Sequence, residues 1–232
     1  MKTLKSAILA SVATVAIASA AAPAFAEEEG FLGGEVSANV AITTQYRFRG
    51  VSLSNEDIAI QGGLDYSHES GFYVGTWMSS MDDTVAFGET EMDVYAGYGG
   101  EIEGFSYDIG LLMYVYPSGN SSDYLEAYGS VGADLGVASA TVGMAYAFSS
   151  DNTGDQDNIY VYGDLESAIP DTPFTVSAHL GYEDGFFDSK LDWSIGASVA
   201  YGGLDFGLAY VDTDMAGDMT DATVVFSVGA SF

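Results

Sequence analysis

The chain has 232 residues and is strongly acidic, with 34 Asp and Glu against five Lys and Arg and a net charge of −29. Because binding to nucleic-acid phosphates needs a basic surface, this balance excludes nucleic acid as an expected partner. The sequence has no cysteine, which excludes disulfides and thiolate metal sites. Its 16 Tyr and 13 Phe argue against the disorder that accompanies such acidity in chains poor in aromatic residues.

Residues 1–26 have the features of a secretory signal peptide. A basic start at Lys2 and Lys5 is followed by an apolar run and by a small-x-small cleavage pattern at 24–26. The apolar run is shorter than the ~20 residues that a membrane-spanning helix needs. We therefore expect cleavage before Glu27 and export of the remaining chain. The basic residues left after cleavage are Arg47, Arg49 and Lys190.

The exported part reads as one β-rich domain after a short lead-in. Residues 27–35 are acidic and glycine-rich, and we expect a flexible lead-in there, with a periplasmic plug as the alternative. From residue 36 to 232 the chain alternates apolar with small or polar residues in segments of about ten residues, the length of a tilted membrane-crossing strand. No segment keeps a helical period, and no repeat or linker divides the chain. The expected strands are 37–49, 57–67, 71–79, 90–99, 105–116, 123–133, 138–148, 158–167, 174–183, 192–201, 204–212 and 222–232.

The connections between these segments alternate in length. Connections after the even-numbered segments are short turns, and those after the odd-numbered segments tend to be longer and more polar. Long loops outside and short periplasmic turns are the rule for outer-membrane barrels, and an even number of strands places both ends on the periplasmic side. The pattern predicts an all-β fold: a single antiparallel up-and-down transmembrane β-barrel of about twelve strands.

The two faces of the segments differ as a bilayer requires. The face assigned to lipid has aromatic residues near both strand ends and aliphatic residues between them, as in membrane proteins. The charged residues of the strands lie almost entirely on the other face. This is expected because a charged side chain that faces lipid is destabilising, by about 2–4 kcal/mol for a basic residue at the bilayer midplane. The aromatic residues expected on the lipid face at the outer end are Tyr46, Phe48, Tyr146, Phe148, Tyr182, Trp193 and Tyr210.

The last segment, Ala222–Phe232, is expected to close the barrel beside the first. One of its faces is wholly apolar and the other is mostly small or polar. A strand that ends on an aromatic residue such as Phe232 resembles the signal read by the bacterial barrel-assembly machinery, which is therefore an expected partner. The expected location is the cell outer membrane, with outer-membrane lipid and lipopolysaccharide as further partners.

The inward face carries the candidate site. Arg47 and Arg49 are expected near the outer end of the first strand as the only basic side chains inside the barrel, within reach of carboxylates. Two interpretations stay open: a salt-bridge network that stiffens and partly fills the lumen, and a constriction that orients permeating solutes. The residues expected to line a pore are Arg47, Arg49, Gln61, Asp65, Glu91, Asp93, Tyr95, Glu126 and Tyr128.

No catalytic, metal or cofactor site is expected. His68 falls in a predicted turn and His179 on an inward face, and neither has an identifiable serine or carboxylate partner by spacing. The aspartates of 151–157 and 212–221 do not match the spacing of an EF-hand loop, so solvated loop charge is the favoured interpretation, and weak divalent-cation bridging to lipopolysaccharide is the alternative.

Several runs of the sequence also resemble a known family. These runs are 46–52 (YRFRGVS), 61–66 (QGGLDY), 71–77 (GFYVGTW), 93–98 (DVYAGY) and 114–117 (YVYP), together with Glu126. They resemble the TorF family of porins, a proteobacterial group also filed as proteins of unknown function. The resemblance covers essentially the whole exported chain and implies an outer-membrane barrel with a pore, but it brings no catalytic or ligand residues.

Together these features predict a porin-like channel for passive diffusion of small solutes. A barrel of about twelve strands is narrower than the 16–18-stranded porins, and inward tyrosines narrow it further. Inward carboxylates favour cations, so the expected channel is narrow and cation-preferring. The alternatives are a closed structural or surface-interaction barrel and an outer-membrane hydrolase.

Overall fold

The computed structural model describes residues 31–83, 87–119 and 122–232. The predicted signal peptide, 1–26, and the start of the lead-in, 27–30, lie outside the described residues. The first described element is a short 3-10 helix, η1 (Phe31–Gly33), and the first strand begins directly after it at Gly34. In the described part of the chain, no helix is both long and apolar enough to cross a membrane.

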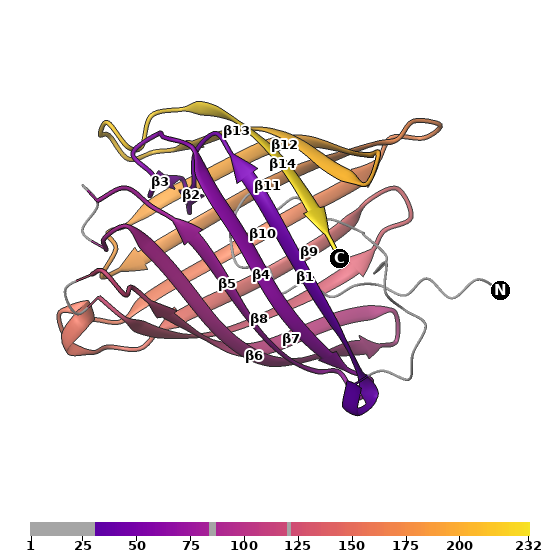
Figure 1. Ribbon diagram of the computed structural model, residues 1–232, viewed down its shortest axis with the longest axis horizontal. Coiled ribbons are helices and arrows are strands. Elements are labelled where there is room, and N and C mark those ends of the chain that lie inside the picture. The colour runs from indigo at the N-terminus through magenta and orange to yellow at the C-terminus, as the bar shows by residue number, and fades with distance from the viewer. Residues whose placement is uncertain (1–30, 84–86, 120–121) are drawn as a thin grey trace.

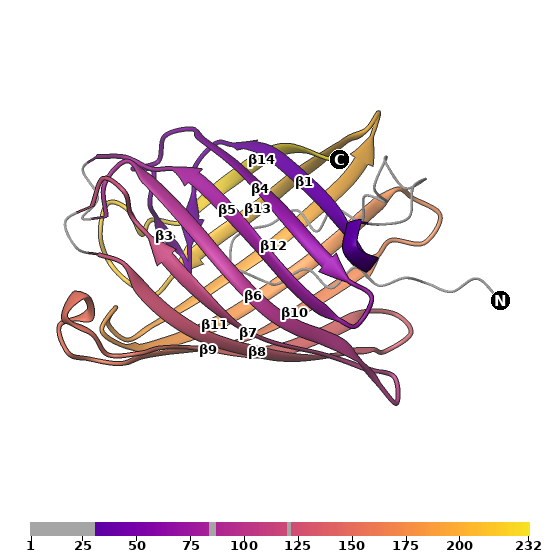
Figure 2. The same cartoon turned by 60° about the horizontal axis from the view of Figure 1, so that its bottom comes forward.

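Twelve antiparallel strands form one closed barrel, which confirms the predicted fold class. Each strand pairs with its neighbours along the chain, and Figures 1 and 2 show the strands tilted around a common axis. The strands are β1 (Gly34–Thr43), β4 (Ala59–His68), β5 (Phe72–Ser80), β6 (Thr90–Ile102), β7 (Phe105–Val115), β8 (Tyr124–Asp134), β9 (Ser139–Ala147), β10 (Asn158–Ala168), β11 (Phe174–Gly185), β12 (Lys190–Tyr201), β13 (Leu204–Thr213) and β14 (Thr223–Ser231).

The barrel closes where β14 meets β1, as the sequence predicts. Ile42 of β1 lies opposite Val228 of β14, and Asn39 lies opposite Ser231. Beyond the last strand residue, Phe232 exchanges two backbone hydrogen bonds with Ala38, at 3.0 and 2.8 Å. The terminal residue is therefore part of the seam.

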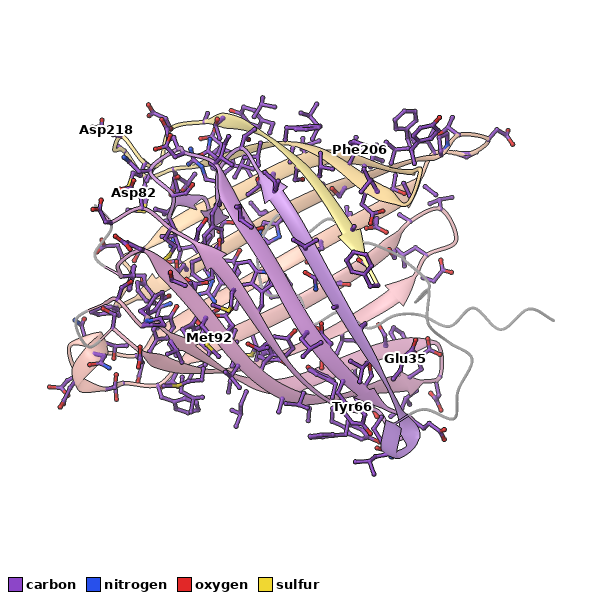
Figure 3. The ribbon with its side chains drawn as sticks, in the orientation of Figure 1. Glu35, Tyr66, Asp82, Met92, Phe206 and Asp218 are labelled. Carbon is purple, nitrogen blue, oxygen red and sulfur yellow. The ribbon has the colours of Figure 1, made fainter. Side chains whose placement is uncertain are left out.

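The two ends of the barrel differ in the length of their connections. At one end the strands are joined by two to five residues, as in the turn 202–203 between β12 and β13. At the other end the connections run from four to fifteen residues, the longest being 44–58, and one of them contains the 3-10 helix η2 (Asp151–Thr153). In Figure 3, Asp82 and Asp218 mark the end with long connections, and Glu35 and Tyr66 mark the opposite end.

The outer face of the strands is apolar and the inner face holds the buried side chains. In β5, for example, Phe72, Val74 and Met78 are exposed while Ser79 is buried. The exposed aliphatic residues of the other strands include Ile42, Ile60, Leu64, Ile109, Leu111, Val142, Ile195 and Leu208. This is the surface that a barrel presents to lipid.

The first predicted strand is wrong beyond Thr43. Residues 44–58 turn into the barrel and form a hairpin of β2 (Arg47–Phe48) and β3 (Val51–Ser52), seen within the outline of the barrel in Figures 1 and 2. Tyr46 is only 1% exposed, and Phe48 packs with it against the interior cluster. The prediction that these two rings belong to the lipid-facing girdle is therefore wrong.

The local sequence explains why the chain folds back. Arg49 and Gly50 connect the two short strands and have φ values of +46° and +84°. A two-residue hairpin turn with positive φ at both positions is the type favoured between twisted strands, and glycine is preferred at the second. Across this turn Phe48 pairs with Val51, so the alternation changes phase. The two strands of the hairpin have only two residues each, which is too short for alternation in the sequence to reveal the change.

Candidate functional site

The hairpin 44–58 packs against the inner wall formed by β5 to β8. The ring of Tyr46 contacts the edge of Trp77 on β5, with centroids 5.5 Å apart. The ring of Phe48 contacts Tyr114 on β7 in the same edge-on manner, at 5.8 Å. These contacts belong to the main buried cluster of the described residues, whose members lie mostly on strand ends and connections at the long-connection end of the barrel. The hairpin is therefore a packed part of the interior.

Arg49, at the tip of the hairpin, joins two distant strands of the wall. Its Nη1 donates to Glu183 Oε1 on β11 at 2.6 Å, and its Nη2 donates to both oxygens of Glu126 on β8 at 2.9 Å. The guanidinium also lies over the ring of Tyr160, 4.3 Å from the centroid. Burial is the largest single influence on the pKa of Arg49 and lowers it, but the Glu126 carboxylate and the neighbouring tyrosines together raise the pKa above its usual value. Arg49 is thus a charged cross-link inside the barrel.

Arg47 holds the base of the hairpin to the connection 214–222. Its Nη1 donates to the backbone oxygens of Gly50 at 2.8 Å and Met219 at 3.0 Å. Its Nη2 donates to the backbone oxygen of Asp221 at 3.0 Å and lies 3.4 Å from a carboxylate oxygen of Glu56. The backbone of Ser52 adds a further hydrogen bond to Met219, at 2.8 Å. Arg47 therefore serves as an anchor for the hairpin.

Two buried charges, Lys190 and Glu183, are missing from the predicted set of inward residues. Lys190, expected in a loop, is the first residue of β12, is 4% exposed and forms an ion pair with Glu183. The expectation that Arg47 and Arg49 are the only basic side chains inside is therefore wrong. The same alternation that places Asp192 inward also places Lys190 inward, so extending the strand by two residues would have found it.

The predicted carboxylates do not all reach the arginines. Glu126 pairs with Arg49, whereas Glu91 instead accepts a hydrogen bond from the Tyr46 hydroxyl at 2.6 Å. Asp93 is fully buried, and the described residues supply no hydrogen bond to either of its carboxylate oxygens. Glu91 and Asp93 therefore form a part of the interior in which no basic side chain of the described chain forms an ion pair with either carboxylate.

The remaining predicted residues form hydrogen bonds along the wall. Asp65 on β4 accepts a hydrogen bond from Tyr95 on β6, and Gln61 donates to Ser79 Oγ at 3.3 Å. Tyr128 shares a hydrogen bond of 2.5 Å with the hydroxyl of Tyr73, which donates in turn to Asp108 at 2.6 Å. None of these hydrogen bonds involves Arg47 or Arg49.

His179 has carboxylate partners that sequence spacing did not reveal. Its Nδ1 lies 2.6 Å from Asp164, which is directly opposite it on β10. Its Nε2 lies 2.7 Å from the hydroxyl of Tyr160 and 3.1 Å from Asp192. Both ring nitrogens therefore face polar oxygens of the wall. In the described residues, no group of three or more His, Asp or Glu side chains has the arrangement of a metal site.

The fold defines the class of protein to which this chain belongs: closed, twelve-stranded antiparallel barrels, with a fold similar to that of outer-membrane porins. The chain itself belongs to the family described as "Bacterial protein of unknown function (Gcw_chp)", which it matches over residues 27–232. The family description does not carry the TorF name, so the resemblance to TorF porins stays a prediction. No curated protein matches the sequence.

Several solved structures share the fold at low sequence identity. The KdgM porin in complex with disordered oligogalacturonate is 12% identical, with a TM-score of 0.60 over 84% of this chain and 98% of that one. The NanC porin is 11% identical, with a TM-score of 0.57 over 85% and 98%. The COG4313 outer membrane channel from Pseudomonas putida F1 is 10% identical, with a TM-score of 0.51 over 91% and 98%. At these identities the likeness concerns the fold alone.

Proposed function

We propose that the protein is a narrow, porin-like channel of the outer membrane through which small solutes diffuse passively, with a preference for cations. The observation that carries the proposal is the hairpin 44–58, folded into a closed barrel whose outer face is apolar. A segment held inside a twelve-stranded barrel narrows the passage that this number of strands leaves.

The charge of the interior supports the preference for cations. Glu91, Asp93 and Glu126 lie together on the inner wall, and Arg49 forms an ion pair with one of these three carboxylates, Glu126. Rings of carboxylates favour cations in pores. The KdgM porin is described in complex with oligogalacturonate, a polyanion, and we propose that this chain selects the opposite charge.

Conductance in a planar bilayer tests the proposal directly. The purified chain should give small single-channel steps, and a salt gradient should give a reversal potential of the sign expected for cations. Absence of steps would reject the channel, and an anion-selective reversal potential would reject the cation preference.

A closed structural barrel is the second candidate, because the hairpin is packed into the interior rather than lying along the wall. Liposome swelling separates the two: a channel admits small neutral solutes, whereas a closed barrel admits none. A hydrolase is the least supported alternative. A His179→Ala variant assayed for lipase and peptidase activity tests it, and activity that is present in the wild type and lost in the variant would revive it.

A further inference from the structure

We propose that Glu91 and Asp93, with the aromatic rings beside them, form a binding site for a small organic ammonium ion beneath the hairpin. The proposal rests on the proposed function and deepens it, because it names the class of cation that the interior recognises. It begins from one feature of Asp93: a fully buried carboxylate with no hydrogen bond to either oxygen from the described residues.

Among the described residues, no basic side chain forms an ion pair with Asp93. The charged groups that act on Asp93 are the carboxylates of Glu91 and Glu126, both of its own sign. Glu126 has Arg49 as its partner, and Glu91 has the hydroxyl of Tyr46. Because an ionised carboxylate is costly to bury without an opposite charge, this region favours a cation.

The walls of the region are aromatic. Asp93 on β6 lies directly opposite Trp77 on β5 and directly opposite Tyr114 on β7, so both rings share its inward face. The hairpin contributes a second ring on each side, since Tyr46 contacts Trp77 and Phe48 contacts Tyr114. The carboxylate therefore lies between two aromatic pairs.

This combination selects an organic ammonium ion over a metal ion. The described acidic side chains do not converge in the manner of metal ligands. Ring faces attract alkylammonium groups through the quadrupole of the ring, and cages of aromatic residues recognise quaternary ammonium ions. A carboxylate among such rings adds the opposite charge. Because Asp93 and Glu91 are fully buried under the hairpin, the ion enters by displacing the hairpin; its alkyl groups then contact the rings while the positive nitrogen faces the two carboxylates.

Fluorescence of Trp77 gives a direct measure of binding. The chain has two tryptophans, so a Trp193→Phe background leaves Trp77 as the only one. The probe is choline chloride, titrated to equilibrium into the folded protein in detergent at constant ionic strength. The neutral isostere 3,3-dimethylbutanol and potassium chloride serve as matched ligands. We expect a saturable change with choline and none with the other two.

Two isosteric variants assign the site. Asp93→Asn removes the unpaired carboxylate and should weaken choline binding at least about tenfold, as expected for loss of a charged partner next to rings. Asp108→Asn makes the same change in net charge at another buried carboxylate, one that accepts a hydrogen bond from Tyr73, and should leave the affinity unchanged within about twofold. Heat-modifiable migration on gels confirms that both variants fold.

The outcomes separate this proposal from the proposed function. No saturable response to choline, an equal response to potassium or the neutral isostere, or unchanged binding in Asp93→Asn would overturn the ammonium site, whatever the conductance. Choline binding in a protein that gives no channel steps would support the site and reject the channel. Current block by choline that is lost in Asp93→Asn would support both.

Discussion

Arg49 and Glu126 are 77 residues apart in sequence, and the Arg49 Nη2 donates to both oxygens of the Glu126 carboxylate at 2.9 Å inside the barrel. The Arg49 Nη1 reaches Glu183 on the far strand β11 at 2.6 Å, so one side chain ties the hairpin to two parts of the wall. All three side chains are at most 2% exposed. This cross-link therefore helps to hold the hairpin in position, together with Arg47 and the packed rings of Tyr46 and Phe48.

Replacing Arg49 should loosen the hairpin and enlarge the channel. Arg49→Met keeps much of the side-chain volume but leaves Glu126 buried without its charged partner. Loss of one member of a buried pair costs about 3–5 kcal/mol. We expect the free energy of unfolding, measured by urea titration in detergent, to fall by that order, and the single-channel conductance to rise.

A second substitution provides the control for Arg49→Met. Adding Glu126→Gln removes the orphaned charge, so the double variant should recover part of the lost stability while the hairpin stays released. If Arg49→Met has wild-type conductance while its stability falls, the arginine stabilises the barrel without controlling the passage.

The turn of the hairpin gives a second prediction. Gly50 has φ of +84°, and a Cβ placed there would lie 2.9 Å from the Thr213 Cβ and 3.0 Å from the Asp192 Cβ. Gly50→Ala combines an unfavourable backbone conformation with two close contacts, and we expect a loss of about 2–4 kcal/mol in urea unfolding. The same variant should raise conductance if the hairpin is displaced.

Gly136 is a matched control for Gly50. It has the same φ of +84°, but a Cβ there would have nothing within 4 Å. Gly136→Ala should therefore lower the free energy of unfolding only by the cost of the left-handed backbone conformation, about 1–2 kcal/mol, and leave the conductance unchanged. Equal losses in the two variants would mean that the contacts around Gly50 relax easily.

The barrel itself was predictable because a bilayer imposes a pattern on every strand. Inward positions such as Glu91, Asp93 and Glu126 followed from alternation alone, since charges cannot face lipid cheaply. The hairpin was not predictable in this way, because its strands β2 and β3 have two residues each and are too short for the change of phase at Arg49 and Gly50 to be recognised. The partners of Arg49 depend on the reversal of the chain at this turn. The sequence therefore predicts that arginines and carboxylates meet inside the barrel, but it does not determine which of them form pairs.

The lipid-facing surface gives a third prediction, which depends on depth. Leu111, in the middle of β7, is an exposed aliphatic residue, and Ile102 is equally apolar and exposed but lies at the end of β6 beside a short turn. An arginine near the midplane of a bilayer costs about 2–4 kcal/mol, and one near the interface about 0–1 kcal/mol. In lipid vesicles, Leu111→Arg should therefore lower the free energy of unfolding far more than Ile102→Arg. Similar losses would argue that this face does not lie in a bilayer.

The seam gives the last prediction, which concerns assembly in the cell. Phe232 pairs with Ala38 through its backbone, at 3.0 and 2.8 Å, while its ring is about half exposed at the edge of the barrel. Phe232→Ser keeps both backbone hydrogen bonds and removes the ring. If the barrel-assembly machinery recognises the ring, the variant should refold in detergent with wild-type yield but accumulate less folded protein in the outer membrane of expressing cells. Refolding of the purified chain is the internal control: an equal defect in both settings would assign the ring to barrel stability instead of recognition.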